Sequence, residues 1–190
     1  MALARCPGTG LPAPPPPLRR APGPVLVVAA RYATSPVGPY LELAVAQPVR
    51  LGLRLATCAA AMVVDSAGSR DAGRRSWGLP TEMGTLHWSV EGDDVSLRWE
   101  EGGVAVTSHP AGPRFPVVIP FRSLQTLAGT PVHFGGRARG TGRFSLIDVA
   151  VEAGSPLACL AGRHRALHLT EAATRMGEAR LVPPTLVTRR

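Results

Sequence analysis

The chain has 190 residues, of which 45% are hydrophobic and 18% charged, and its formal net charge is +8. This composition is typical of one globular domain and excludes a largely disordered chain. The longest apolar run, residues 55–64, is too short for a membrane-spanning helix, and no apolar stretch of signal-peptide length follows Arg5. We therefore expect a cytoplasmic protein with no membrane partner.

The basic charge does not predict nucleic-acid binding. Part of it lies in the terminal segments, which carry Arg5, Arg19, Arg20, Arg189 and Arg190 and no acidic residue. The other arginines are spread along the chain, and aromatic residues are only 5%. A nucleic-acid interface needs a concentrated basic surface, so we expect no nucleic-acid partner.

Every basic residue apart from histidine is arginine, because the chain contains no lysine. A lysine Schiff base is therefore excluded. The three cysteines are widely scattered, and His164 and His168 have no carboxylate or cysteine beside them, so the spacing predicts neither a metal site nor another cofactor.

The chain order predicts a mainly β (α+β) protein. Residues 1–24 are proline-rich and predict a disordered leader, followed by a single domain over residues 25–186. Apolar runs predict strands over 25–32 and 40–46, the second ended by Pro48. Residues 51–65 form a third apolar run, read as a strand, although pattern alone leaves a buried helix open.

Residues 65–83 connect this run to the next one and are rich in glycine and arginine, which predicts a functional loop. Three short alternating runs between residues 83 and 110 then predict an antiparallel meander, and residues 115–125 an edge strand or bulge. Residues 135–142 predict a mobile hairpin turn, and residues 144–151 a further strand. The expected fold is a curved antiparallel sheet.

A strand glutamate and the central connection provide the candidate site. Glu42 lies between two leucines in an apolar strand, and if it faces the interior it must be paired or have a raised pKa. Arg74 and Arg75 are its natural partners. A structural ion pair and a ligand-facing carboxylate both stay open at this point.

Four short blocks occur in a distinctive order and spacing. They are GPYLE (38–42), Asp65, GRR (73–75) and WGLP (77–80). Together they resemble the acetoacetate decarboxylase superfamily, with the resemblance extending over residues 25–185. It implies a barrel with a central pocket lined by Tyr40, Glu42, Arg74, Trp77, Thr81 and Glu82.

The resemblance also implies that the ancestral chemistry is lost. In that family, the residue after the proline is the lysine that forms an imine with a β-keto acid, and a second lysine follows. This chain has Thr81 and Glu82 there, and neither side chain forms an imine. The family's catalytic glutamate maps onto Glu42, which is the candidate catalytic residue.

Three functions follow from this mapping. The first is non-covalent binding of a small organic (oxo)acid or apolar ligand in the pocket. The second is lyase-type acid–base chemistry, decarboxylation included, in which Glu42 or Glu82 transfers protons and Arg74 stabilises negative charge. The third is a structural or interaction protein with a vestigial pocket. Assembly into a homo-oligomer is compatible with each of them.

Overall fold

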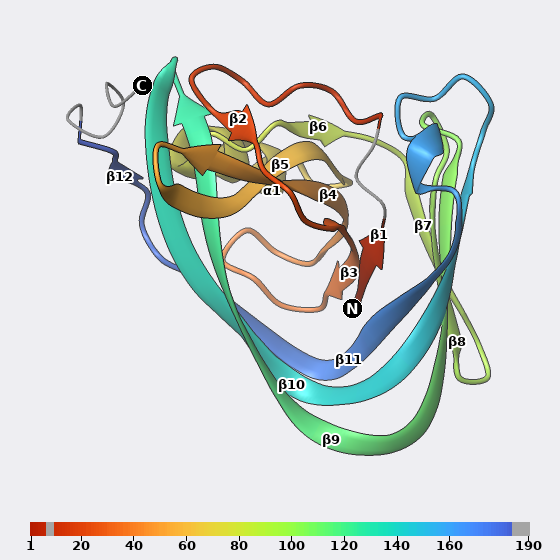
Figure 1. Cartoon of the computed structure of the whole chain (residues 1–190). Helices are drawn as coiled ribbons and strands as arrows, with labels where there is room; N and C mark the ends of the chain where they lie inside the picture. The colour runs from red at the N-terminus through yellow and green to blue at the C-terminus, as the bar shows by residue number, and fades with distance from the viewer. Residues whose placement is uncertain (7–9, 184–190) are drawn as a thin grey trace.

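The protein's structure, a computed structural model, describes residues 1–6 and 10–183. Figure 1 shows long curved strands that surround shorter N-terminal strands. The described residues include one α-helix, α1 (Ala67–Trp77), and one 3₁₀ helix, η1 (Ala158–Leu160). The strands are β1 (Ala2–Cys6), β2 (Arg19–Arg20), β3 (Val25–Tyr32), β4 (Tyr40–Leu51), β5 (Arg54–Val64), β6 (Thr81–Met83), β7 (Leu86–Glu91), β8 (Asp94–Trp99), β9 (Val104–Leu127), β10 (Thr130–Val151), β11 (Gly162–Met176) and β12 (Arg180–Leu181). The prediction of a mainly β fold is confirmed.

The strand pairings form a closed circuit. They follow the order β10-β11-β1-β3-β4-β5-β9, and β9 also pairs with β10. The weakest join is between β5 and β9, which share the single pair Thr57–Ser123. The sheet is mixed, because this join and the β5–β6 pairing are parallel, whereas the sequence had predicted antiparallel pairing throughout.

Two hydrophobic clusters fill the concave side of the sheet. The larger contains Leu43, Val45 and Val63, and the smaller contains Val49, Leu51 and Cys58. Alternation along β4 points residues 43, 45, 47, 49 and 51 to one face, so the buried Gln47 lies between the clusters. Gln47 thus separates the two apolar clusters on this face of β4.

The N-terminal segment is part of the fold, so the prediction of a disordered leader is wrong for its described residues. β1 pairs with both β3 and β11, and β2 pairs with β4. Between them, Leu11 is buried in the larger cluster and Leu18 in the smaller one. Burial of these two leucines anchors the intervening prolines, which composition alone suggested were mobile.

Two other expectations from local composition are corrected. β4 continues through Pro48, which pairs with Thr57 of β5 and whose carbonyl accepts from the Ala21 N–H on the opposite side. The missing N–H would point to the same side as this carbonyl, where the β3 ladder ends at Ala46 and the β2 ladder begins at Val49. Residues 135–142 are not a turn but lie within β10. A side chain at Gly136 would collide with the Phe121 ring of β9, so glycine there allows the two strands to pack closely.

The predicted meander is confirmed as β7, β8 and the start of β9. Residues 115–125 lie in β9, and residues 115–122 pair with β10 on one side only, which together with four prolines along residues 110–120 agrees with an edge position. The edge ends at Ser123, which pairs with Thr57 of β5. The described residues include no helix with the length and hydrophobicity to cross a membrane.

Candidate functional site

The connection over residues 65–83 is a helix followed by a short parallel strand rather than a loop. Ser66 caps α1 by accepting a hydrogen bond from the Ser69 N–H at 3.3 Å. Gly78 ends it in the left-handed conformation, with φ of 66°, and its N–H bonds to the Arg74 carbonyl. The chain thus passes from β5 through α1 to β6.

Thr81, at the position implied for the Schiff-base lysine, is fully buried. Its hydroxyl donates to the Met62 sulfur at 3.4 Å, and its carbonyl accepts a 2.6 Å hydrogen bond from Arg74 Nε. A Cβ atom added at Gly73 would lie 2.6 Å from the Thr81 hydroxyl, so α1 packs directly on this residue. These contacts give Thr81 a role in seating the helix on β6.

Glu42 is a buried carboxyl on β4, and burial raises its pKa to about 7. Tyr40 and Tyr32 lie beside it as a stacked pair with ring centroids 4.6 Å apart. Burial raises the pKa of Tyr40 to about 12, with a further rise from the charge of Glu42. The strand pattern left a solvent-facing and a buried position open for Glu42, and in the structure Glu42 is buried. The described residues include no ion pair between Glu42 and an arginine.

The structure does not bring all six predicted residues into one cavity. In the strand register, Glu42 pairs with Val64, and Thr81 pairs with Met62, so the two Cα atoms are roughly 12 Å apart by strand geometry. Arg74 and Glu82 are exposed. Trp77 donates its indole N–H to the Gly177 carbonyl at 2.8 Å and packs against Phe134.

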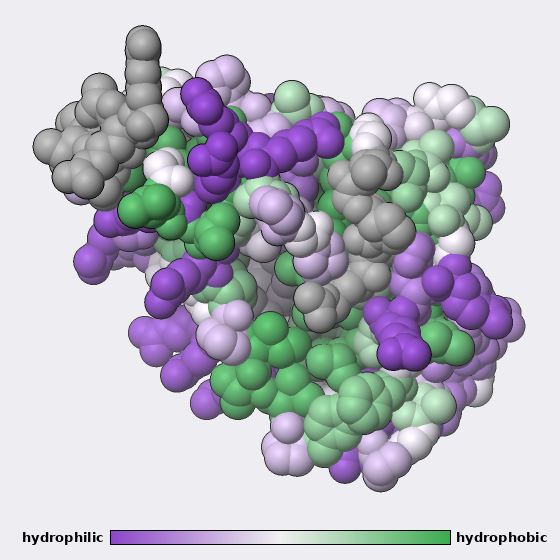
Figure 2. Space-filling model, viewed as in Figure 1, coloured by the Kyte–Doolittle hydropathy of each residue, from purple (hydrophilic) through white to green (hydrophobic). Residues whose placement is uncertain are grey.

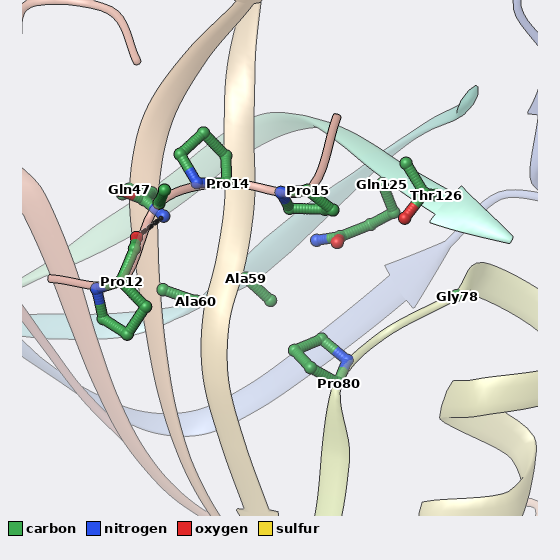
Figure 3. A pocket seen from close by; sticks show the side chains of 11 residues that line it. Pro12, Pro14, Pro15, Gln47, Ala59, Ala60, Gly78, Pro80, Gln125 and Thr126 are labelled. Atoms are coloured by element: carbon green, nitrogen blue, oxygen red, sulfur yellow. Dashed lines mark hydrogen bonds between the residues drawn. The ribbon is translucent and has the colours of Figure 1, made fainter. Parts of the chain in front are cut away.

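A pocket of about 320 Å³ lies between the two hydrophobic clusters, and we call it the proline-capped pocket. Figure 3 shows prolines of the N-terminal segment above it, with Ala59, Ala60 and Pro80 opposite. The lining consists of Pro12, Ala13, Pro14, Pro15, Gln47, Ala59, Ala60, Gly78, Pro80, Gln125 and Thr126. None of the six predicted residues belongs to it, although Gly78 and Pro80 lie close to Thr81 in the sequence.

The polar groups of this pocket are uncharged. Gln47 donates its amide to the Pro12 carbonyl at 3.0 Å, which ties the N-terminal segment over the pocket. The carbonyl oxygen of the Gln125 side chain accepts from the Cys58 thiol at 3.3 Å. Thr126 provides the third polar side chain. Such a lining suits a small, weakly polar molecule.

A buried serine–histidine pair lies elsewhere in the sheet and was not predicted. The hydroxyl of Ser108 is 3.0 Å from His168 Nδ1 and 2.9 Å from the Ser145 hydroxyl. Burial lowers the pKa of His168 to about 4. All three side chains are almost completely buried and do not line the proline-capped pocket, so they form a structural network. Among described residues, no cluster of three His, Cys, Asp or Glu is arranged to bind a metal.

Comparison with known proteins agrees with this architecture of a curved, mainly β sheet. The sequence profile of the family described as acetoacetate decarboxylase (ADC) matches residues 14–136. The chain therefore belongs to the acetoacetate decarboxylase family. Among curated proteins, none matches the sequence significantly.

Solved structures share the fold at low identity. The acetoacetate decarboxylase of Legionella pneumophila is 16% identical with a TM-score of 0.56, over 89% of this chain and 77% of that one. A further acetoacetate decarboxylase is 17% identical with a TM-score of 0.60, over 95% and 84%. The enduracididine biosynthesis enzyme MppR, in complex with pyruvate, is 15% identical with a TM-score of 0.55, over 95% and 86%.

Sequence reasoning missed the residues that line the proline-capped pocket. One available signal was the spacing of Leu11 and Leu18, two apolar residues on either side of a proline run. Another was Ser66 with Gly78, which are typical helix-capping residues at the two ends of α1. No local pattern places Gln47 and Gln125 in one pocket, because they are 78 positions apart and line it together only through the strand pairing.

Proposed function

We propose that this protein binds a small, neutral or weakly polar molecule non-covalently in the proline-capped pocket, without Schiff-base chemistry. The observation that carries the proposal is the lining, which combines prolines and alanines with two amides and one hydroxyl and includes no charged side chain. Few, well-placed polar groups within apolar walls are the usual form of a small-molecule site.

The same observation selects between the two ligand classes predicted from the sequence. An organic acid needs a cation or several donors to replace the water lost by its carboxylate, and no arginine or histidine lines the pocket. A neutral ketone, ester or aromatic molecule meets no such cost. We therefore favour the apolar class over the organic acid.

The predicted site residues then act around the pocket rather than in it. We assign Thr81 and Arg74 to the seating of α1, because they are joined to each other by the 2.6 Å hydrogen bond. We assign Trp77 to the contact between α1 and β10 through Phe134. Glu82, exposed on β6, has no role in ligand contact in this proposal.

A second candidate function is acid–base catalysis at Glu42, and one observation favours it. A carboxyl with a pKa of about 7 exchanges protons near neutral pH, as a general acid or base must. The predicted partnership with Arg74 receives no support, because Arg74 is exposed and bonded to the Thr81 carbonyl. Any such reaction would need another group to hold developing negative charge.

A thermal-shift screen of neutral ketones, esters and aromatics, with small carboxylic acids as a second set, tests the proposal. Ala59→Leu puts three extra carbons into the pocket wall, and Ala150→Leu makes the same change at an exposed position on β10. We expect a neutral compound to stabilise the wild type and Ala150→Leu while leaving Ala59→Leu unshifted. Stabilisation by acids alone, or equal shifts in both variants, would contradict it.

If neither set of compounds gives a shift, the third predicted function, an interaction protein with a vestigial pocket, takes precedence. A cytoplasmic location and assembly into a homo-oligomer are further proposals. Fractionation of cells and light scattering on the purified chain are the measurements that decide them.

A further inference from the structure

A second, larger cleft lies beside the hairpin that joins β4 and β5, and we call it the hairpin cleft. Its volume is about 590 Å³. The lining comprises Leu53, Arg54, Leu55, Ala56, Arg122, Ser123, Leu124, His133, Phe134 and Gly135. It shares no residue with the proline-capped pocket, and no function discussed so far uses it.

The cleft follows from the narrow join between β5 and β9. In the described sheet these strands share only the ladder pair Thr57–Ser123, where the Thr57 hydroxyl donates to the Arg122 carbonyl at 3.0 Å and the Ser123 hydroxyl to the Thr57 carbonyl at 3.1 Å. Residues 54–56 precede the join on β5, and Arg122 precedes it on β9. The described sheet contains no pair between residues 54–56 and Arg122. In Figure 1, the β4–β5 hairpin lies beside the ends of β9 and β10. The edges of β5 and β9 that face each other before the join therefore form the two sides of the hairpin cleft.

The charge of the cleft is entirely basic. Arg54 and Arg122 line it together with His133, and no aspartate or glutamate belongs to the lining. Within the described part of the chain, neither arginine forms an ion pair. Gly135 pairs with Arg122 in the β9–β10 register, so β10 places no side chain directly beside Arg122. Two permanent cations are thus available to an anion.

Apolar surface adjoins these cations. Leu53 is 96% exposed and Leu55 68% exposed, and both line the cleft. Figure 2 shows hydrophobic and hydrophilic side chains next to each other at the upper left, where the hairpin meets β9 and β10 in the same view. Two exposed leucines beside these arginines present an amphipathic surface to solvent.

We propose that the hairpin cleft binds an amphipathic carboxylate of the fatty-acid class. The carboxylate lies between Arg54 and Arg122, which present planar, bidentate donors that match its two oxygens. The hydrocarbon chain covers Leu53 and Leu55 and removes them from water. Charge complementarity selects the anion, and the exposed leucines select an apolar tail over a small, fully polar acid.

Calorimetric titration with decanoate tests this site on the full chain. We expect the double variant Arg54→Gln/Arg122→Gln to bind decanoate at least about tenfold more weakly than the wild type, since both charge-assisted contacts are lost. The matched control is Arg98→Gln, an exposed arginine on β8, which should leave affinity unchanged. Leu53→Ser/Leu55→Ser should weaken binding as well, because it removes the apolar contact. The altered side chains are exposed, so the variants should keep the wild-type melting temperature.

Decanol is the second compound in this titration, because it has the same hydrocarbon chain without the carboxylate charge. The proposal requires decanol to bind more weakly than decanoate and to be insensitive to the arginine substitutions. Equal affinity of the double variant and the wild type for decanoate would overturn it, as would a failure of decanoate to bind the wild type. Loss of decanoate binding in Ala59→Leu but not in the arginine double variant would also overturn it, since the acid would then occupy the proline-capped pocket.

Discussion

Glu42 shows how burial alone can set the properties of a side chain. Its carboxyl lies in the sheet beside two stacked tyrosines, and the described residues provide no cation to compensate its charge. Its pKa therefore rises to about 7 from the ordinary value of 4.5. In the folded protein, this group holds its proton across a pH range in which an unfolded chain would release it.

The pH dependence of stability follows with a defined sign. The folded-state pKa is above the unfolded value, so the contribution of Glu42 is fully present below pH 4.5 and is lost as pH rises through 7. We predict that Glu42→Gln is more stable than the wild type at pH 8, by up to about 3 kcal/mol, and that the difference vanishes near pH 4. Urea denaturation at both pH values measures this difference.

Glu82→Gln is the control for that prediction, because it makes the same change at an exposed position two strands away. Its effect should be within about 0.5 kcal/mol at either pH. If wild type and Glu42→Gln show the same dependence of stability on pH, then Glu42 is not the buried acid described here.

At the residue scale, chemistry could be predicted from the sequence better than geometry. The loss of Schiff-base chemistry could be predicted from the absence of lysine alone. The apolar strand around Glu42 left its side open, and only the structure shows that the carboxyl is buried. That Arg74 bonds to a backbone carbonyl instead of the Glu42 carboxylate could not be predicted, because it depends on how α1 is rotated above β6.

α1 illustrates the same limits at the scale of an element. The glycines and arginines of this segment predicted a functional loop. The segment is a helix because Ser66 and Gly78 cap its two ends and because it packs against Thr81. Gly78 is required twice: its φ of 66° is left-handed, and a Cβ there would lie 2.4 Å from the Thr126 carbonyl oxygen.

We predict that Gly78→Ala destabilises the protein by about 2–3 kcal/mol, through backbone strain together with this collision. Gly92→Ala is the matched control, because Gly92 has a similar φ of 62° and open space around its Cα. It should cost only about 1 kcal/mol, the backbone part. Equal losses in urea denaturation would show that α1 does not pack closely against residue 126.

The N-terminal segment shows why its proline-rich composition led to a wrong prediction of disorder. Prolines give an extended, unbonded backbone, which in isolation is solvated and mobile. Here the flanking Leu11 and Leu18 are buried in different clusters, and Gln47 holds the Pro12 carbonyl. Order in such a segment depends on distant partners, so it could not be predicted from the segment itself.

At the scale of the whole molecule, closure of the sheet creates both cavities. β9 and β10 curve around the N-terminal strands, and β5 meets β9 at one residue pair, as Figure 1 illustrates. On one side of this join lies the hairpin cleft, and Gln125, beyond it, lines the proline-capped pocket. The mainly β class was predictable from alternating strand patterns, whereas this long-range closure was not.

A crystal structure of the protein with the tightest neutral ligand from the thermal-shift screen is the most direct test of the proposed function. We predict ligand density between Pro14 and Ala59, within reach of the Gln47 and Gln125 amides, with no covalent bond to the protein. Density beside Glu42 and Tyr40 instead, with the proline-capped pocket empty, would contradict this account and would favour acid–base chemistry at Glu42.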